Sequence, residues 1–138
     1  MVVIEIIGLA SGSHCMRSVL RYVPALALMG LIFFLSAQSD LPAVSSDLDI
    51  ALRKAAHMTE FGLLWVLWLR ALPGPRVQAA LSALAITLAY AVFDEIHQSF
   101  VPGRYASPLD VAIDAAGAGI AAAMWVASAS RTRSAPCR

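Results

Sequence analysis

Residues 90–104, YAVFDEIHQSFVPGR, end the apolar run 77–93 with the densest group of polar side chains in the chain. An apolar run of this length is typical of a helix in lipid, where ionisable groups are costly to bury. Such groups need partners from other parts of the chain, and their default interpretation is a polar functional site. The side chains concerned are Asp94, Glu95, His97, Gln98 and Arg104.

The composition agrees with a membrane protein. The chain has 138 residues, of which 59% are hydrophobic and 14% charged, and its mean hydropathy is +0.73. These values exclude a water-soluble domain of this size. Four apolar runs, 18–37, 58–72, 77–93 and 109–129, approach the roughly 20 residues that a spanning helix needs, and the last is rich in Gly and Ala, which suits close helix approach. With no alternating strand pattern, the sequence predicts an all-α membrane protein, a bundle of four transmembrane helices.

We expect three parts along the chain. Residues 17–130 form the four-helix transmembrane domain, residues 1–16 are an extension before it, and residues 131–138 are a basic cytoplasmic tail. The extension matches neither a signal peptide nor a span, whereas Met16 and Arg17 would open the first helix naturally. The sequence leaves open whether Met1 or Met16 is the true start.

Capping residues indicate where the helices begin. Ser46 and Asp49 read as a capping box before the second helix. Ser107 is expected as N-cap of the fourth helix, with Pro108 at its first position and Asp110 at its third. The other expected bounds are a first helix over 18–37, an end of the second at Pro73-Gly74-Pro75, and a third from Arg76 to about Phe100.

Basic residues are distributed unequally between the two ends of the predicted bundle. One end holds Arg17, Arg21, Arg70, Arg76, Arg131, Arg133 and Arg138; the other holds Arg53, Lys54 and Arg104. The positive-inside rule then predicts a multi-pass membrane protein with both termini in the cytoplasm. Cys15 and Cys137 would both lie on the reducing side, so no structural disulfide is expected.

Helix geometry places the polar groups at one depth. With a rise of about 1.5 Å per residue, Lys54, Asp94 and Asp114 lie about 24, 27 and 26 Å from the basic residue at the cytoplasmic end of their helices. At about 100° per residue, the polar side chains of each helix also share a face, although Glu60 is offset by about 60° from His57. We therefore expect an outward-facing polar pocket with the ligand-binding residues Lys54, His57, Glu60, Asp94, Glu95, Gln98, Arg104, Asp110 and Asp114.

A purely structural interpretation of these residues stays open. Asp94 and Glu95 need partners, and Lys54 and Arg104 are the expected ones in a network of ion pairs. Lys54 could instead only extend to the lipid headgroups, and Asp110 could only cap its helix. Either histidine, His57 or His97, could be buried and hydrogen-bonded without chemistry.

An ordered set of short motifs resembles the VanZ-like family of small bacterial membrane proteins. The resemblance covers about residues 22–124 and implies four transmembrane helices in the bacterial envelope, which places the protein in the cytoplasmic (inner) membrane. The family is named after a member linked to resistance to teicoplanin, a glycopeptide. One departure is Asp114, where the family's pattern would have asparagine. The motifs are Phe34-Leu35-Ser36-Ala37-Gln38-Ser39, Lys54-x-x-His57-x-x-Glu60-Phe61-Gly62, Asp94-Glu95-x-x-Gln98 with Pro102-Gly103-Arg104, and Asp110-x-x-x-Asp114-x-x-Gly117.

Three classes of function fit these residues. The first is a non-enzymatic envelope protein that binds an anionic lipid-linked or cell-wall-related ligand through Lys54 and Arg104. The second is an outer-leaflet enzyme that uses acid–base chemistry or a divalent ion; its catalytic candidates are Asp94, Glu95, His57 and His97. A small transporter is a weaker third alternative. No metal-ligand motif is present, so no metal is assigned; the cofactor stays unknown, and the expected partners are the bilayer and that ligand, with no nucleic acid.

Overall fold

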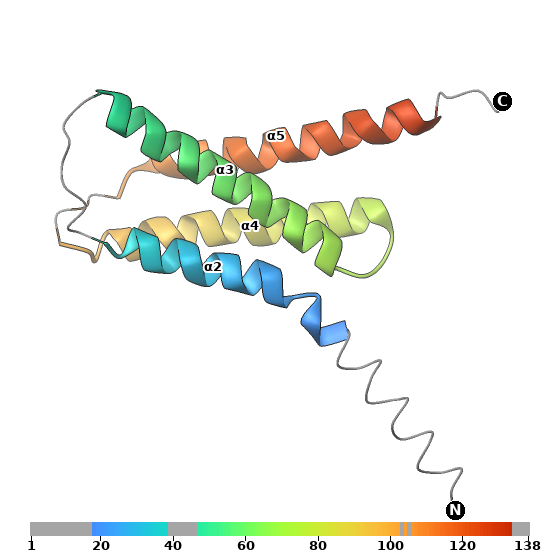
Figure 1. Cartoon of the computed structure of the whole chain (residues 1–138), viewed down its shortest axis with the longest axis horizontal. Coiled ribbons are helices and arrows are strands. Elements are labelled where there is room, and N and C mark those ends of the chain that lie inside the picture. Colours follow the sequence, from blue (N-terminus) through green and yellow to red (C-terminus); the bar gives the residue numbers. More distant parts are fainter. Residues whose placement is uncertain (1–17, 39–46, 103, 105, 134–138) are drawn as a thin grey trace, which may run out of the picture.

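The computed structural model describes residues 18–38, 47–102, 104 and 106–133. Within these ranges the chain forms four helices and no strand (Figure 1): α2 (Val23–Ser36), α3 (Asp47–Ala71), α4 (Arg76–Gln98) and α5 (Pro108–Arg133). The predicted extension over 1–16, the capping residue Ser46 and the tail after Arg133 lie outside the described residues.

The observed helix ends follow the local chemistry of the sequence. Proline stands in the first turn of α2, where its missing N–H removes no helical hydrogen bond. After α3, Gly74 has a φ of 105°, a left-handed conformation that favours glycine. Ser107 Oγ accepts a hydrogen bond from Leu109 N at 3.3 Å and Pro108 opens α5, as predicted for this N-cap. α4 ends at Gln98, two residues earlier than predicted.

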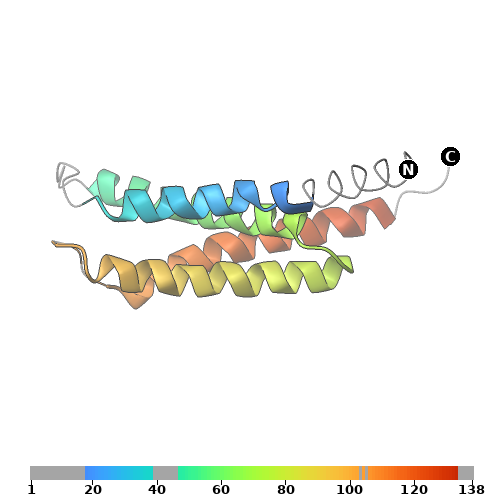
Figure 2. The same cartoon turned by 90° about the horizontal axis from the view of Figure 1, so that it is seen from below.

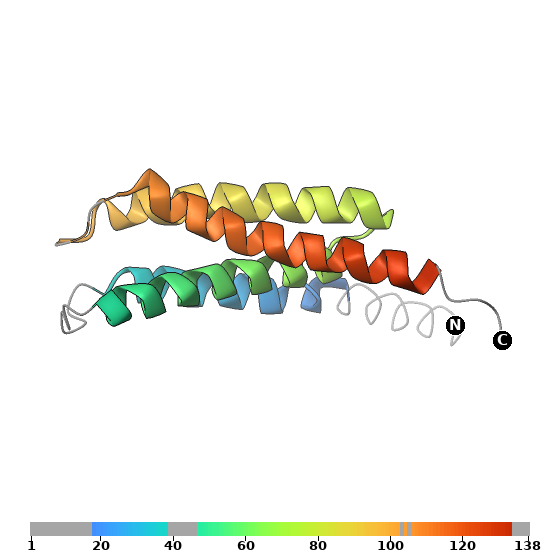
Figure 3. The same ribbon diagram turned by 90° about the horizontal axis from the view of Figure 1, so that it is seen from above.

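The four helices lie lengthwise in two layers. Figures 2 and 3 show α2 and α3 in one layer and α4 and α5 in the other. α3 packs most extensively against α5. This contact is close because Gly117 of α5 faces the backbone of Met58: a Cβ added at Gly117 would stand 2.8 Å from the Met58 carbonyl carbon. Glycine at such a crossing lets two backbones approach inside lipid.

Two small clusters of buried side chains form the core. One joins α2, α3 and α4 and includes Ile32, Phe61 and Tyr90. The hydroxyl of Tyr90 also donates to the backbone oxygen of Met29 at 2.6 Å, which ties α4 to α2. The second cluster contains Trp65, with Ala83 and Ala118 as the small residues opposite it.

Most of the apolar surface faces outward. Three helical segments are long and apolar enough to cross a membrane, Ser18–Ser36, Arg76–Gln98 and Pro108–Arg131, and only 11%, 39% and 17% of their apolar windows are buried inside the protein. Large side chains such as Phe34 and Val77 are more than half exposed, as expected where lipid covers them. These segments fit a multi-pass membrane protein.

The fourth predicted span is different. α3 is not among the segments that fit a span within the described residues, because its first half carries Arg53, Lys54 and Glu60. Its apolar part is confined to the second half, from Phe61 onward. Four spans therefore stay a prediction, whereas three of the four helices in the described residues are observed to be apolar and long enough to span.

Candidate functional site

A polar pocket of about 180 Å³ lies at the end of the bundle where α3 and α5 begin and α4 ends. This end is at the left of Figure 1. α3 contributes three side chains, α5 three, and α4 with its following loop the remaining two. The lining residues are Arg53, Lys54, His57, Gln98, Arg104, Asp110, Ile113 and Asp114.

Two pairs, each of a basic and an acidic side chain, join α3 to α5 across this pocket. Lys54 Nζ lies 3.1 Å from Asp110 Oδ1, and the two side chains are 38% and 41% exposed. His57 Nδ1 lies 3.5 Å from Asp114 Oδ1, where Asp114 is almost completely buried. Lys54 and His57 are three residues apart in α3, and Asp110 and Asp114 are four apart in α5, so each helix presents both of its residues on one face. The first pair is therefore at the rim and the second deeper in the bundle.

A chain of hydrogen bonds connects the pocket to α2. Arg104 Nη1 donates to Gln98 Oε1 at 3.1 Å, and Gln98 Nε2 donates to Asp94 Oδ2 at 2.8 Å. The hydroxyl of Ser36 donates to the same carboxylate oxygen at 2.9 Å. Arg104 Nη2 also donates to the backbone oxygen of Gln38 at 3.3 Å, just after α2 ends. Arg104 thus attaches the loop after α4 to the end of α2 in two ways: directly at the Gln38 backbone, and through Gln98 and Asp94 to Ser36.

The two adjacent acids lie behind the pocket wall. Asp94 is completely buried and Glu95 is 6% exposed. Glu95 Oε1 accepts a hydrogen bond from the backbone N–H of Ser107, which precedes α5. The second oxygen of Asp94 is buried without a hydrogen-bond partner among the described residues. Asp114 Oδ1 is also buried, and the described group that faces it is His57 Nδ1 at 3.5 Å, at the outer limit of a hydrogen bond. Buried carboxylate oxygens with so few donors are sites where a proton or a water would be expected.

The structure brings most of the predicted ligand-binding residues to this pocket. Of the nine, Glu60, Asp94 and Glu95 are not in the lining, and neither is the catalytic candidate His97. Glu60 is half-buried in α3 but does not line the pocket. The ring of His97, a predicted catalytic candidate, stacks on Phe33 with 3.9 Å between ring centres, on the α2 side of α4. The residues that do line the pocket are Lys54, His57, Gln98, Arg104, Asp110 and Asp114, with Asp94 and Glu95 directly behind them.

The predicted pairing of the cations was wrong. Lys54 pairs with Asp110 rather than with Asp94 or Glu95. Arg104 makes no ion pair with a described carboxylate, and reaches Asp94 only through the amide of Gln98. The physical reason is distance along the bundle: Asp94 is one helical turn below Gln98, so a loop arginine meets the amide first.

Sequence reasoning missed Ser36 and the wall residue Ile113, and took Arg53 only as a residue at a helix end. Ser36 had a detectable signal, because it ends the first apolar run at the same depth as Asp94 and belongs to the quoted Phe34–Ser39 motif. Within the described ranges no group of three or more His, Cys, Asp or Glu side chains is placed to hold a metal ion.

The fold and the site define a small helical membrane protein with a charged pocket at one end of its bundle. A family model described as VanZ/LLP1 matches residues 20–129 of the chain. The chain therefore belongs to the VanZ-like family, as the motifs indicated. Neither a curated protein nor a solved structure matches it significantly.

Proposed function

We propose that the chain is an envelope protein that binds an anionic headgroup of a lipid-linked or cell-wall-related molecule in this pocket. The observation that carries the proposal is the charge of the lining. Arg53, Lys54 and Arg104 bring three cationic side chains, against the two carboxylates of Asp110 and Asp114. With His57 neutral, the side chains of the lining alone sum to one positive unit (3 − 2 = +1); this sum does not include Asp94 and Glu95, which are buried behind the lining. Arginine and lysine together suit phosphate and carboxylate oxygens.

The size of the pocket supports a headgroup as the ligand. A volume of about 180 Å³ is below the roughly 300 to 1,000 Å³ typical of sites that enclose a drug-sized molecule. It suits a phosphate or a carboxylate with a few waters. The apolar remainder of the ligand would lie in the bilayer beside the bundle. A link to glycopeptide resistance would then act through a cell-wall precursor, because the pocket is too small to enclose the antibiotic.

A binding assay with purified full-length chain in detergent tests the proposal. The probes are a polyprenyl phosphate, a polyprenyl pyrophosphate and the matching uncharged polyprenol, each with and without a divalent cation. We expect the charged lipids to bind and the alcohol to bind at least about tenfold more weakly, since hydrogen bonds to charged groups contribute about 1.5 to 3 kcal/mol.

Matched variants locate the binding site. Lys54→Gln and Arg104→Gln should each weaken binding of the charged lipids about tenfold. Arg131→Gln is the control, because Arg131 is exposed at the opposite end of α5 and does not line the pocket. Equal binding of the uncharged polyprenol, or an equal loss in Arg131→Gln, contradicts the proposal.

The pair formed by His57 and Asp114 favours one second candidate, an outer-leaflet enzyme. A histidine oriented by a buried carboxylate is the arrangement that general acid–base catalysis uses. His57 Nδ1 and Asp114 Oδ1 lie 3.5 Å apart, and both residues line the pocket. Asp114→Asn separates the two functions. If the chain only binds its ligand, this variant should keep or strengthen binding, because a negative charge is removed from the pocket. If the chain is an enzyme, the variant should lose turnover of a lipid-linked substrate.

A further inference from the structure

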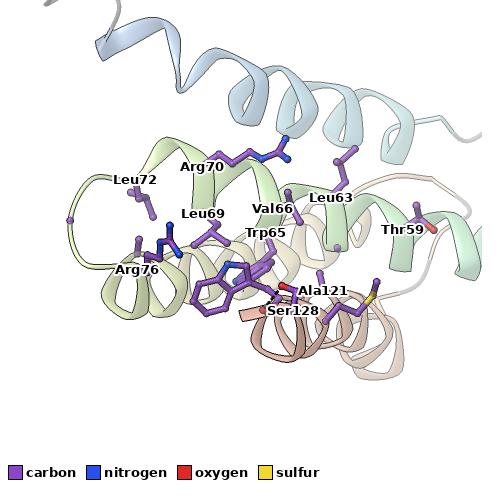
Figure 4. A pocket seen from close by; sticks show the side chains of 15 residues that line it. Thr59, Leu63, Trp65, Val66, Leu69, Arg70, Leu72, Arg76, Ala121 and Ser128 are labelled. Carbon is purple, nitrogen blue, oxygen red and sulfur yellow. Dashed lines mark hydrogen bonds between the residues drawn. The ribbon is translucent and has the colours of Figure 1, made fainter. Parts of the chain in front are cut away.

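A second and larger cavity lies at the opposite end of the bundle from the polar pocket. It has a volume of about 910 Å³ and follows the contact between α3 and α5 down to the α3–α4 turn. Figure 4 shows Thr59 at one end of this groove, Trp65 and Ala121 along it, and Leu72 with Arg76 at the other end. A smaller cavity of about 230 Å³ continues the groove past Thr59 along the same two helices.

The walls of the groove are apolar over most of their length. Trp65 and Trp125 stand edge to face with 6.3 Å between ring centres, and Leu63, Val66 and Met124 complete the sides. From Thr59 to Leu72 the groove follows thirteen residues of α3, which is about 20 Å. One leaflet of a hydrocarbon core about 30 Å thick is roughly 15 Å deep. The groove is therefore long enough for a lipid acyl chain.

The end of the groove at the α3–α4 turn is positively charged. Arg70 and Arg76 both line it and both are exposed. Neither forms a hydrogen bond or an ion pair with another described residue, and this half of α3, α4 and α5 carries no Asp or Glu. The polar pocket, by contrast, has the carboxylates of Asp110 and Asp114 beside its cations. Two uncompensated arginines beside an apolar groove are complementary to an anion that carries a long apolar tail.

The first turn of α4 adds to this charge. Gly74, Arg76 and Ala79 line the groove where α4 begins. Pro75 precedes the helix and no side chain caps its first N–H groups. Free N–H groups and the positive end of the helix dipole favour a phosphate at this place.

We infer that this groove binds an anionic glycerophospholipid, with one acyl chain between α3 and α5 and the phosphate at Arg76 and Arg70. The inference does not depend on the ligand of the polar pocket, which lies at the other end of the helices. By the predicted orientation, the bound lipid belongs to the cytoplasmic leaflet.

Quenching of tryptophan fluorescence by brominated lipid tests the inference directly. The full chain is placed in phosphatidylcholine vesicles, and a small fraction of the lipid is exchanged for phosphatidylglycerol or phosphatidylcholine with brominated acyl chains. Trp65 and Trp125 report the groove. We expect brominated phosphatidylglycerol to reach half-maximal quenching at a severalfold lower mole fraction, and most of this excess to disappear in Trp125→Phe.

Arginine variants assign the preference to the groove. Arg70→Gln and Arg76→Gln should each remove most of this severalfold preference, because one basic residue near an anionic lipid surface contributes about 1 kcal/mol, or about fivefold. Lysine at the same positions should retain most of it. Arg131→Gln is the matched control, because Arg131 is exposed at the same end but does not line the groove.

Three results would overturn the inference. The first is equal quenching by the two brominated lipids in the unmodified chain. The second is a loss in Arg131→Gln as large as in Arg76→Gln, which would indicate general attraction of anionic lipid. The third is groove tryptophans that neither lipid quenches, together with the mass of a dimer, which would assign the groove to a second copy of the chain.

Discussion

Asp94 is completely buried, and one of its oxygens accepts hydrogen bonds from both Ser36 and Gln98. A buried carboxylate with few donors depends strongly on each of them. We predict that Ser36→Ala lowers the free energy of unfolding by about 1 to 3 kcal/mol, whereas Ser36→Thr retains the hydroxyl and most of the stability. Reversible unfolding in mixed detergent micelles measures both. Equal stability of Ser36→Ala and the unmodified chain would mean that Asp94 does not need this donor.

The two pocket cations should differ in their effect on stability. Lys54 and Asp110 form a half-exposed pair, and such pairs contribute about 0 to 1 kcal/mol. Arg104 donates to Gln98 and to the backbone oxygen of Gln38, so its removal leaves two acceptors unpaired. We predict a loss of about 1 to 3 kcal/mol for Arg104→Ala and less than about 1 kcal/mol for Lys54→Ala. Reversible unfolding in mixed micelles measures the loss in both variants. A larger loss in Lys54→Ala than in Arg104→Ala would contradict the hydrogen-bonded role of Arg104.

Depth along the helix and facing angle predicted the pocket residues well where a basic residue at the cytoplasmic end of the helix fixed the depth. Lys54, His57 and Asp114 are of this kind. The same angles put His97 with them, but a stripe of about 100° is wide enough to face two neighbours, and His97 at its edge packs on Phe33 of α2. The hydrogen bond from Ser36 to Asp94 depends on how α2 packs against α4, and helical periodicity does not predict that packing.

At the scale of elements, the contact between α3 and α5 is closest at Gly117. Gly62 of α3 lies opposite it, and a Cβ added at Gly62 would stand 3.1 Å from the Gly117 backbone oxygen. A Cβ at Gly117 would collide with the backbone of Met58, whereas a Cβ at Gly119 would meet nothing within 4 Å. The sequence indicated close approach from the small residues of this helix, but composition alone does not say which glycine faces the neighbour.

We predict that Gly117→Ala pushes α3 and α5 apart and lowers stability by more than about 2 kcal/mol, the scale of overpacking in a close contact. Gly119→Ala is the matched control on the same helix and should be neutral or slightly stabilising, because alanine is the better helix former. Thermal unfolding in detergent compares the two. The same shift in both variants would mean that helix propensity, and not the crossing, determines the effect.

At the scale of the whole molecule, the described chain separates two kinds of charged surface. The polar pocket at one end contains acids and bases together, while the other end carries arginines without described acids. The sequence predicted this asymmetry correctly because it depends only on the order of charges along four helices. It did not predict the groove between α3 and α5, which arises from the crossing of two helices and is invisible to a count of residues.

The asymmetry leads to a prediction of orientation. Arginine-rich ends are retained in the cytoplasm, so the pocket end should face outward and the α3–α4 turn inward. Labelling of single cysteines in intact cells with a membrane-impermeant maleimide tests this, in a chain whose Cys15 and Cys137 have been replaced by serine. Ala106→Cys, exposed in the loop before α5, should react, and Val77→Cys, 66% exposed in the first turn of α4, should react only after the membrane is permeabilised. The opposite pattern would reverse the orientation and place the polar pocket in the cytoplasm. Labelling of both sites in intact cells would mean that α4 does not span the membrane, since these positions lie near its two ends.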